Sequence, residues 1–284
     1  MKWISDNNVL IVGLGLMGGS YAKALKRLGY KVYAIDRNEE SISYAINENI
    51  IDDGKSFPDP ELISKADAVI FALYPEAFRE WIRENQQYFH EGVMITDVTG
   101  VKSSIVYDIQ DMLREDVEFI PSHPMAGREL SGVKSADDKI FRNANYIVTP
   151  TKKNTKEAIE WCKSLGRILG VGKISVLSPE EHDEMIGFVS QLTHCIAVSL
   201  MTCSDDENLA DYTGDSFRDL TRIARINENM WSELFLMNKD KLIEKMDVFI
   251  NEFSQLKDMI KNDNRAGLCE KMKLSTKRRA WFDK

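Results

Sequence analysis

The sequence predicts an α/β fold in which an N-terminal Rossmann-type domain, built on a doubly wound and mainly parallel sheet, precedes an all-helical domain. Three observations support this fold class. Short β-like runs alternate with helix-like segments from Val9 to about Ser178, a glycine-rich turn follows the first run, and the β-like runs cease after Ser178. We therefore place the first domain at residues 1–178 and the second at residues 179–284.

The elements of the first domain follow the strand–helix alternation in chain order. Each predicted strand is a short run rich in β-branched residues, and each predicted helix is longer and amphipathic. The predicted strands are residues 9–12, 31–35, 68–73, 93–96, 117–120, 146–149 and 173–176. The predicted helices include residues 18–28, 77–88, 103–113 and 155–169.

The second domain begins with a capping box at Ser178, Pro179, Glu180 and Glu181, which is typical of a helix start. Two apolar stripes at helical spacing follow. For the first stripe, burial within the chain is the simpler interpretation, whereas the near-heptad second stripe indicates contact with a partner chain and hence a homodimer. The first stripe comprises Met185, Val189, Leu192, Ile196 and Leu200, and the second comprises Leu242, Met246, Phe249, Phe253, Leu256 and Ile260.

Composition excludes several classes of protein. Lys and Arg number 37 against 45 Asp and Glu, so the formal net charge is −8, and 43% of the residues are hydrophobic. An acidic chain lacks the broad basic surface that binds nucleic acid or an anionic membrane. The apolar runs fall short of the roughly 20 residues that span a bilayer, and no secretion signal precedes the first strand. We expect a cytoplasmic protein with no nucleic-acid or membrane partner.

The cysteines and histidines do not form a recognisable metal-binding pattern. The four cysteines show no CxxC spacing, and the four histidines are too scattered to complete a zinc site with them. We therefore expect no metal. The residues concerned are Cys162, Cys195, Cys203, Cys269, His90, His123, His182 and His194.

The turn after the first strand carries a GxGxxG pattern at a strand-to-helix junction. Gly13 permits the tight turn, Gly15 lets a pyrophosphate approach the backbone, and Gly18 allows close packing of the helix on the strand. Backbone N–H groups at the start of the helix, at Leu16 and Met17, are donors for the phosphates. A purely structural turn, or a site for FAD or S-adenosylmethionine, is the alternative.

The carboxylate after the second strand favours NAD as the cofactor. Asp36 lies 23 residues after Gly13, where its oxygens can accept hydrogen bonds from both adenosine ribose hydroxyls. A carboxylate there repels the 2′-phosphate of NADP. Arg37 is adjacent and would attract that phosphate, so NADP remains the alternative.

Two segments that follow strands of the first domain carry candidate chemistry. One runs from Asp97 to Lys102, and the other contains His123. At the carboxyl ends of parallel strands, His123 would face a bound nicotinamide and accept a hydroxyl proton while the carbon releases hydride. A loop histidine that bonds to backbone is the alternative interpretation.

The helical half contains a cationic segment. Arg218, Arg222 and Arg225 are spaced at i, i+4 and i+7, so we expect one helical face that grips a substrate carboxylate. A solvated face paired with nearby aspartates is equally compatible with the spacing. His194 lies on a mostly apolar helix, where a histidine is more often part of the core.

Taken in order, these motifs resemble the prephenate dehydrogenase family. The resemblance runs from Val9 to Leu256 through GLGLMGGS, DVTGVK, SHPMAG, the histidine after EEHD, and SFRDLTRIA. It implies a nucleotide-binding domain and a helical dimerisation domain. It also implies NAD-dependent oxidative decarboxylation of prephenate to 4-hydroxyphenylpyruvate, a step in tyrosine biosynthesis. We expect no appended regulatory or chorismate mutase domain.

The resemblance assigns roles to particular residues. His123 matches the catalytic histidine, and His194 matches a second histidine that lines the substrate pocket. Arg222 matches the arginine that binds the substrate carboxylate, with Arg218 one turn before it, and Glu129 matches an acidic residue that can pair with that arginine.

Two positions depart from the family pattern. Many relatives have serine where this chain has Gly100, and histidine where it has Gln191. Thr99 is a candidate to supply the missing hydroxyl to the substrate. The alternatives are an arogenate dehydrogenase, a two-domain β-hydroxyacid or imine reductase, and a non-catalytic NAD-binding sensor.

Overall fold

The computed structural model describes residue 3 and residues 6–283. The chain forms two compact units, Met1–Asn238 and Lys239–Lys284. The predicted change from sheet to helix at residue 178 lies inside the first unit. The nucleotide-binding half and the helices up to Asn238 therefore form one compact body, and every site residue predicted from the sequence lies in it.

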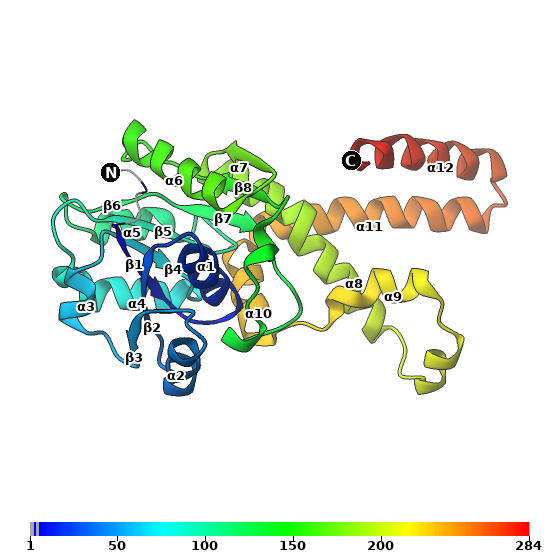
Figure 1. Cartoon of the computed structure of the whole chain (residues 1–284). Helices are drawn as coiled ribbons and strands as arrows, with labels where there is room; N and C mark the ends of the chain where they lie inside the picture. The colour runs from blue at the N-terminus through cyan, green and yellow to red at the C-terminus, as the bar shows by residue number, and fades with distance from the viewer. Residues whose placement is uncertain (1–2, 4–5, 284) are drawn as a thin grey trace. The chain divides into compact units, whose positions relative to one another are not determined.

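A six-stranded parallel sheet forms the centre of this unit, with the strand order β3-β2-β1-β4-β5-β6 (Figure 1). The chain leaves β1 toward β2 and β3 on one side, then crosses to β4, β5 and β6 on the other. This reversal creates a switch point at the carboxyl ends of β1 and β4, which is where doubly wound sheets bind dinucleotides. The strands are β1 (Asn8–Val12), β2 (Lys31–Ile35), β3 (Asp53–Lys55), β4 (Ala68–Phe71), β5 (Met94–Asp97) and β6 (Glu118–Phe119).

Helices cover both faces of this sheet, and the two faces have separate cores. In β1, Val9 and Ile11 pack into one core and Leu10 and Val12 into the other, so every residue after Asn8 is apolar. The first core includes side chains of α1 (Leu16–Arg27), α2 (Glu39–Asn47) and α6 (Lys156–Leu169). The second includes those of α3 (Pro60–Ser64), α4 (Pro75–Asn85) and α5 (Val106–Met112).

A second, three-stranded sheet contains β7 (Ser122–Met125), β8 (Asn145–Val148) and β9 (Lys173–Val176). β7 pairs antiparallel with β8, and β8 pairs parallel with β9. The predicted strands at 146–149 and 173–176 therefore exist but belong to this second sheet. The segment around His123, expected as a loop, is a strand. Pro124 lacks an N–H and argues against a central strand, but β7 is an edge strand, where proline is tolerated.

Short 3-10 turns connect several elements of the first unit. They are η1 (Gln86–Tyr88), η2 (Val133–Ser135), η3 (Asp138–Phe141), η5 (Glu207–Tyr212) and η6 (Arg222–Ala224).

One continuous helix follows β9, formed by α7 (Pro179–Ile186), the π-helical segment η4 (Gly187–Leu192) and α8 (Thr193–Thr202). The predicted capping box is confirmed, because the Ser178 Oγ accepts from the Glu181 N–H at 3.2 Å and the Glu181 carboxylate accepts from the Ser178 N–H at 2.8 Å. Contrary to the sequence expectation, this 24-residue helix is long and apolar enough to cross a membrane by length and composition. Core helices of soluble proteins pass the same test of length and composition.

The arginine segment does not form the single helical face that its spacing predicted. α9 (Asp215–Thr221) ends before Arg222, which begins the 3-10 turn η6, and Arg225 lies beyond it with extended backbone. The side chain of Asn227 then caps α10 (Glu228–Met237) by accepting from the Met230 N–H. The prediction that Arg225 shares a face with the other two arginines is therefore wrong, because this new helix start interrupts the periodicity.

The second unit is a helical hairpin of α11 (Lys239–Lys261) and α12 (Arg265–Arg279), followed by the 3-10 turn η7 (Ala280–Phe282). Asp263 takes a positive φ of 51° at the turn, and Asn264 caps α12. The second long helix predicted from the apolar stripe is confirmed as α11. Phe253 and Ile260 of that stripe are 63% and 60% exposed, so the hairpin presents large apolar side chains to its surroundings.

Candidate active site

The glycine-rich turn has the geometry of a dinucleotide site. Gly13 has a φ of +96°, and a Cβ there would lie 2.6 Å from the Ala72 carbonyl oxygen. A Cβ at Gly18 would lie 1.8 Å from the Gly13 carbonyl oxygen, so both positions require glycine. At Gly15, in contrast, no described atom beyond its chain neighbours lies within 4 Å of such a Cβ. The turn is therefore closely packed at Gly13 and Gly18 and open at Gly15, where a pyrophosphate would approach.

The start of α1 and the end of β2 complete this turn. α1 begins at Leu16 and Met17, and none of the described side chains caps it, so its first N–H groups are available for an anion. The Asp36 carboxylate accepts from the Leu14 N–H at 2.5 Å and from the Asn38 N–H at 2.8 Å. Each oxygen keeps a further lone pair for a ribose hydroxyl. The residues present therefore fit NAD, and Arg37 beside them is exposed.

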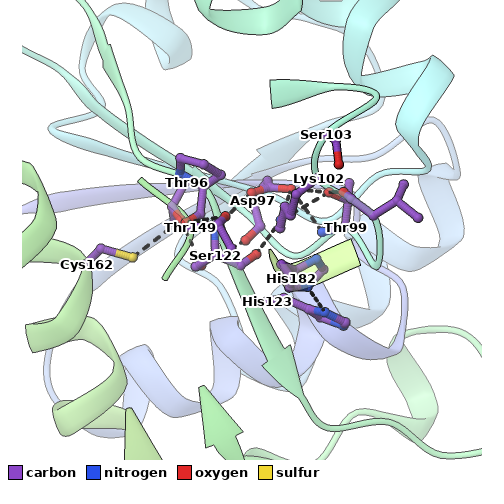
Figure 2. A network of polar contacts seen from close by, with 12 residues as sticks. Thr96, Asp97, Thr99, Lys102, Ser103, Ser122, His123, Thr149, Cys162 and His182 are labelled. Carbon is purple, nitrogen blue, oxygen red and sulfur yellow. Dashed lines mark hydrogen bonds and ion pairs between the residues drawn. The ribbon is translucent and has the colours of Figure 1, made fainter. Parts of the chain in front are cut away.

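A buried polar network lies at the carboxyl end of β5 (Figure 2). The Lys102 ammonium is fully buried and lies 2.7 Å from the Asp97 carboxylate, which is also fully buried. Lys102 also donates to the Ser122 carbonyl oxygen at 2.6 Å. The Ser122 N–H donates to the Asp97 carboxylate at 3.1 Å, which ties the start of β7 to the end of β5. This network holds His123, the next residue of β7, beside the end of the parallel sheet.

The Thr99 side chain is used within this network. Its hydroxyl hydrogen-bonds to the Asp97 carboxylate and to the Val101 carbonyl oxygen, and it accepts from Lys102 at 3.2 Å. The side chain is almost completely buried. Gly100 is the residue beside the catalytic candidate, since a Cβ there would lie 3.9 Å from the His123 Cε1. These contacts give Thr99 a role in shaping the loop around Lys102 and give no support to a substrate contact.

His123 forms a chain of hydrogen bonds that the sequence analysis did not predict. Its Nδ1 lies 2.9 Å from the Nε2 of His182, and the Nδ1 of His182 lies 2.8 Å from the Asp183 carboxylate (Figure 2 shows the two rings). Burial lowers the pKa of His123 well below its ordinary value, and the neighbouring His182 and Lys102 lower it further. Burial also lowers the pKa of His182, although the hydrogen bond to Asp183 opposes this. Both rings are therefore neutral at pH 7.

Asp183 is held by the loop that carries Lys102. Its carboxylate accepts from the Lys102 N–H and the Ser103 N–H, both at 2.8 Å, and from the Ser103 hydroxyl. Burial alone would raise the pKa of Asp183, but the hydrogen bonds from His182 and Ser103 outweigh it, and the pKa lies below its ordinary value. An acidic residue directly after a histidine at a helix start was the available indication in the sequence.

His194 lies on the continuous helix and faces α10. Its Nδ1 donates to the Ser190 carbonyl oxygen at 2.9 Å, and its ring lies against Trp231 with the centroids 3.7 Å apart. Leu234, one turn further along α10, is the nearest side chain to Gly100. α10 therefore borders His194 and the Gly100 segment that lies beside His123.

Arg222 and Glu129 form an ion pair, with the arginine side chain 63% exposed. Burial lowers the pKa of His194, while Glu129 raises it and Arg222 lowers it, so both charges lie within electrostatic reach of this ring. Arg218 is placed differently: it donates to the Thr213 carbonyl oxygen at 3.0 Å and lies 3.8 Å from Asp215 of its own helix. The structure thus brings His194, Glu129 and Arg222 together and directs Arg218 to its own segment.

Comparison with known proteins identifies the family. The sequence matches the description "Prephenate dehydrogenase, nucleotide-binding domain" over residues 21–175 and "Prephenate dehydrogenase, dimerization domain" over residues 178–274. The chain belongs to the prephenate dehydrogenase family. The resemblance stated from the sequence motifs is therefore confirmed.

Relatives in this family match the chain over most of its length. The prephenate dehydrogenase of Bacillus subtilis is 33% identical over 274 residues, covering 92% of this chain and 72% of that protein. The cyclohexadienyl dehydrogenase of Zymomonas mobilis is 28% identical, covering 96% and 94%. The crystal structure of Aquifex aeolicus prephenate dehydrogenase with hydroxyphenyl propionate and NAD+ is 35% identical, with a TM-score of 0.89 and coverage of 99% and 100%.

Gln191, named in the sequence analysis as a departure from the family pattern, is a buried structural residue. Its amide donates to the Leu234 carbonyl oxygen at 2.9 Å and accepts from Asn238 at 2.7 Å. Asn238 also donates to the Asp183 carbonyl oxygen at 3.0 Å. Gln191 therefore fixes α10 against the helix that carries His182 and His194. Within residue 3 and residues 6–283, no group of three or more His, Cys, Asp or Glu side chains could hold a metal ion.

Proposed function

We propose that this chain catalyses the NAD-dependent oxidative decarboxylation of prephenate to 4-hydroxyphenylpyruvate, as a cytoplasmic enzyme of tyrosine synthesis. The observation that carries the proposal is a neutral histidine, His123, held at the carboxyl end of β5 beside the sheet whose first turn fits a dinucleotide. Membership of the family supports it, as does the 33% identity to a protein named prephenate dehydrogenase.

The residues of the chain divide the chemistry between them. When bound, NAD supplies the acceptor for the hydride that leaves the ring carbon bearing the hydroxyl. His123 accepts the hydroxyl proton as the carbon–oxygen double bond forms. Cleavage of the bond to the ring carboxylate then sends its electron pair into the ring, carbon dioxide leaves, and the new ketone becomes a phenol by gaining a proton. Since aromatisation drives the last step, the protein must mainly position the dianion and manage one proton.

We assign binding of a substrate carboxylate to Arg222, which lies near His194. The exposed Arg222 guanidinium can form a bidentate pair with a carboxylate, and His194 lies within electrostatic reach of it. Glu129 is paired with Arg222 in this structure, so a substrate carboxylate would replace the Glu129 carboxylate as the partner of Arg222. Arg218 and Thr99, proposed from the sequence as further substrate contacts, are held by other partners, so Arg222 is the stronger assignment.

Asp36 supports NAD as the preferred cofactor. Its carboxylate lies at the end of β2 beside the glycine turn. There it can accept hydrogen bonds from the ribose hydroxyls of NAD, and it would repel the 2′-phosphate of NADP. We assign the pyrophosphate to Gly13, Gly15 and Gly18 and to the N–H groups of Leu16 and Met17, with Arg37 at the rim.

The deciding assay is NADH absorbance on mixing the purified protein with NAD and prephenate, with arogenate and NADP in parallel. We expect reduction of NAD with prephenate, and the rates with arogenate and NADP measure both preferences. Arg222→Ala should raise KM for prephenate, whereas Arg218→Ala should change it little. A folded protein that binds NAD but reduces none with any of these substrates would contradict the proposal and favour the sensor or reductase alternatives.

The same proposal includes a homodimer formed through the helical half. The matched description of residues 178–274 as a dimerization domain supports it, as do the exposed Phe253 and Ile260 on α11. Light scattering at micromolar concentration should give twice the mass of one chain, and Phe253→Asp should shift it toward the monomer. A monomeric mass for the unmodified protein would refute this part.

A further inference from the structure

The side chain of His182 is the one hydrogen-bond partner of the His123 ring in the described part of the chain. Gly100, which lies beside the His123 Cε1, has no side chain that could hold the ring. His182 comes from α7 and His123 from β7, so the contact joins the helical half to the sheet half of the first unit. The orientation and protonation of His123 therefore depend on what His182 can donate or accept.

His123, His182 and Asp183 form a series of hydrogen bonds, and the surroundings of Asp183 fix the direction of each bond in the series. The Asp183 carboxylate accepts from the Lys102 N–H and from the Ser103 N–H and hydroxyl. A carboxylate surrounded by donors has no hydrogen to give. The contact at 2.8 Å between Asp183 and the Nδ1 of His182 therefore requires the hydrogen to be on that nitrogen.

The position of the hydrogen on His182 determines the position of the hydrogen on His123. A neutral imidazole carries one hydrogen, so His182 with its hydrogen on Nδ1 presents a bare Nε2. The contact at 2.9 Å then requires His123 to donate from its Nδ1. His123 is left with a bare Nε2. A doubly protonated His182 would reverse the last contact. Its complete burial opposes a cation there, and together with the Lys102 ammonium it outweighs the Asp183 and Asp97 carboxylates, so the pKa of His182 lies below its ordinary value.

We propose that His182 and Asp183 are positioning residues that hold His123 as the Nδ1–H tautomer, so that its Nε2 is the atom that accepts the substrate proton. This inference rests on the proposed function for the identity of the proton donor. When Nε2 takes the proton from the ring hydroxyl, the positive charge of the imidazolium faces His182 and, behind it, the Asp183 carboxylate. Asp183 stabilises that charge without itself becoming protonated.

The first experiment measures the tautomer directly. Nitrogen-15 NMR of the imidazole groups of the full-length protein at neutral pH distinguishes a protonated from a bare ring nitrogen, and the spectrum of His123→Asn assigns the signals of His123. We expect Nδ1 of His123 to be protonated and Nε2 bare. A His123 with its hydrogen on Nε2 would overturn the proposal, whether or not the protein turns over prephenate.

The second experiment removes and restores the acceptor. His182→Leu should release the tautomer of His123 and lower kcat with prephenate by roughly 10- to 100-fold while KM changes little, because a proton acceptor acts mainly in the transition state. His182→Gln offers an amide oxygen to the His123 Nδ1 and should recover part of kcat. Unchanged tautomer and kcat in His182→Leu would refute the role.

Two controls separate the possible failures. His90→Asn, a substitution in the loop between η1 and β5, should change neither the tautomer nor kcat. If His182→Leu does not fold, His182→Gln and the spectrum of the unmodified protein still decide the question. Absence of any prephenate turnover, with the expected tautomer present, would contradict the proposed function and leave the positioning of His123 intact.

Discussion

His123 is the residue on which the proposed reaction depends most. Its ring is neutral at pH 7 because burial lowers its pKa, so it accepts a proton without first losing one. We predict that His123→Asn lowers kcat with prephenate by about 10²- to 10⁴-fold and changes KM by less than about threefold, since the acceptor acts mainly in the transition state. Steady-state kinetics of the purified variant measure both. A large rise in KM with normal kcat would instead make His123 a substrate-binding residue.

Lys102 and Asp97 form the second residue-scale feature, a fully buried ion pair under the site. We predict that Lys102→Met lowers the free energy of unfolding by about 3–5 kcal/mol, because it leaves the Asp97 charge buried without its partner. The double variant Lys102→Met with Asp97→Asn should be more stable than the single one. Urea denaturation of both variants measures the difference.

A surface pair provides the matched control for that prediction. Lys153 and Asp111 are 59% and 72% exposed, so Lys153→Met should cost less than about 1 kcal/mol. If Lys102→Met were as mild as Lys153→Met, the buried pair would contribute little to the stability of the fold.

At the scale of elements, the glycines of the β1–α1 turn have different roles: Gly18 is needed for folding and Gly15 for cofactor binding. A Cβ at Gly18 would lie 1.8 Å from the Gly13 carbonyl oxygen, whereas one at Gly15 meets open space. We predict that Gly18→Ala destabilises the protein by roughly 1–3 kcal/mol or more, because the helix must move off the strand. Gly15→Ala should keep its stability and raise KM for NAD on the order of tenfold, because its methyl group occupies the approach of the pyrophosphate. Thermal unfolding and NAD titration of the two variants distinguish these effects, and equal loss of stability in both would contradict the assignment.

The elements also show what local sequence can predict. The strands β1 and β2 and the helix α1 between them could be predicted because their periodicity and the glycine turn are encoded within about 30 consecutive residues. β7 was missed because Pro124 argues against a strand unless its place at the sheet edge is known. The apolar run of α7 to α8 was underestimated because polar residues interrupt it.

Some residues of the site could likewise be predicted from local motifs, whereas others depend on tertiary packing. His123, His194, Glu129 and Arg222 came from motifs, whereas the contact between His123 and His182 joins positions 59 residues apart and depends on tertiary packing. Gln191 looked like a lost site residue in the sequence, and only its contacts with Leu234 and Asn238 show that it holds α10 in place.

At the scale of the whole molecule, the buried histidines couple stability to pH. Burial lowers the pKa of His123, His182 and His194 below the ordinary value of 6.5. Below pH 6.5 the unfolded chain therefore binds protons at these positions that the folded chain does not. The free energy of unfolding must then fall as the pH falls from 6.5 toward the lowered pKa values, by up to about 1.4 kcal/mol per pH unit for each histidine.

We predict that this acid destabilisation is steep in the unmodified protein and shallower in variants that remove one of these rings. Urea denaturation at about pH 7.5 and about pH 5.5 should give a lower free energy of unfolding at the acidic pH, and His194→Gln should reduce the difference between the two. Well above pH 6.5 all three rings are neutral in both states and contribute no slope. A free energy of unfolding that stayed constant down to about pH 5.5 would mean that the folded chain accepts these protons as readily as the unfolded one, and the three rings would not be held neutral by burial.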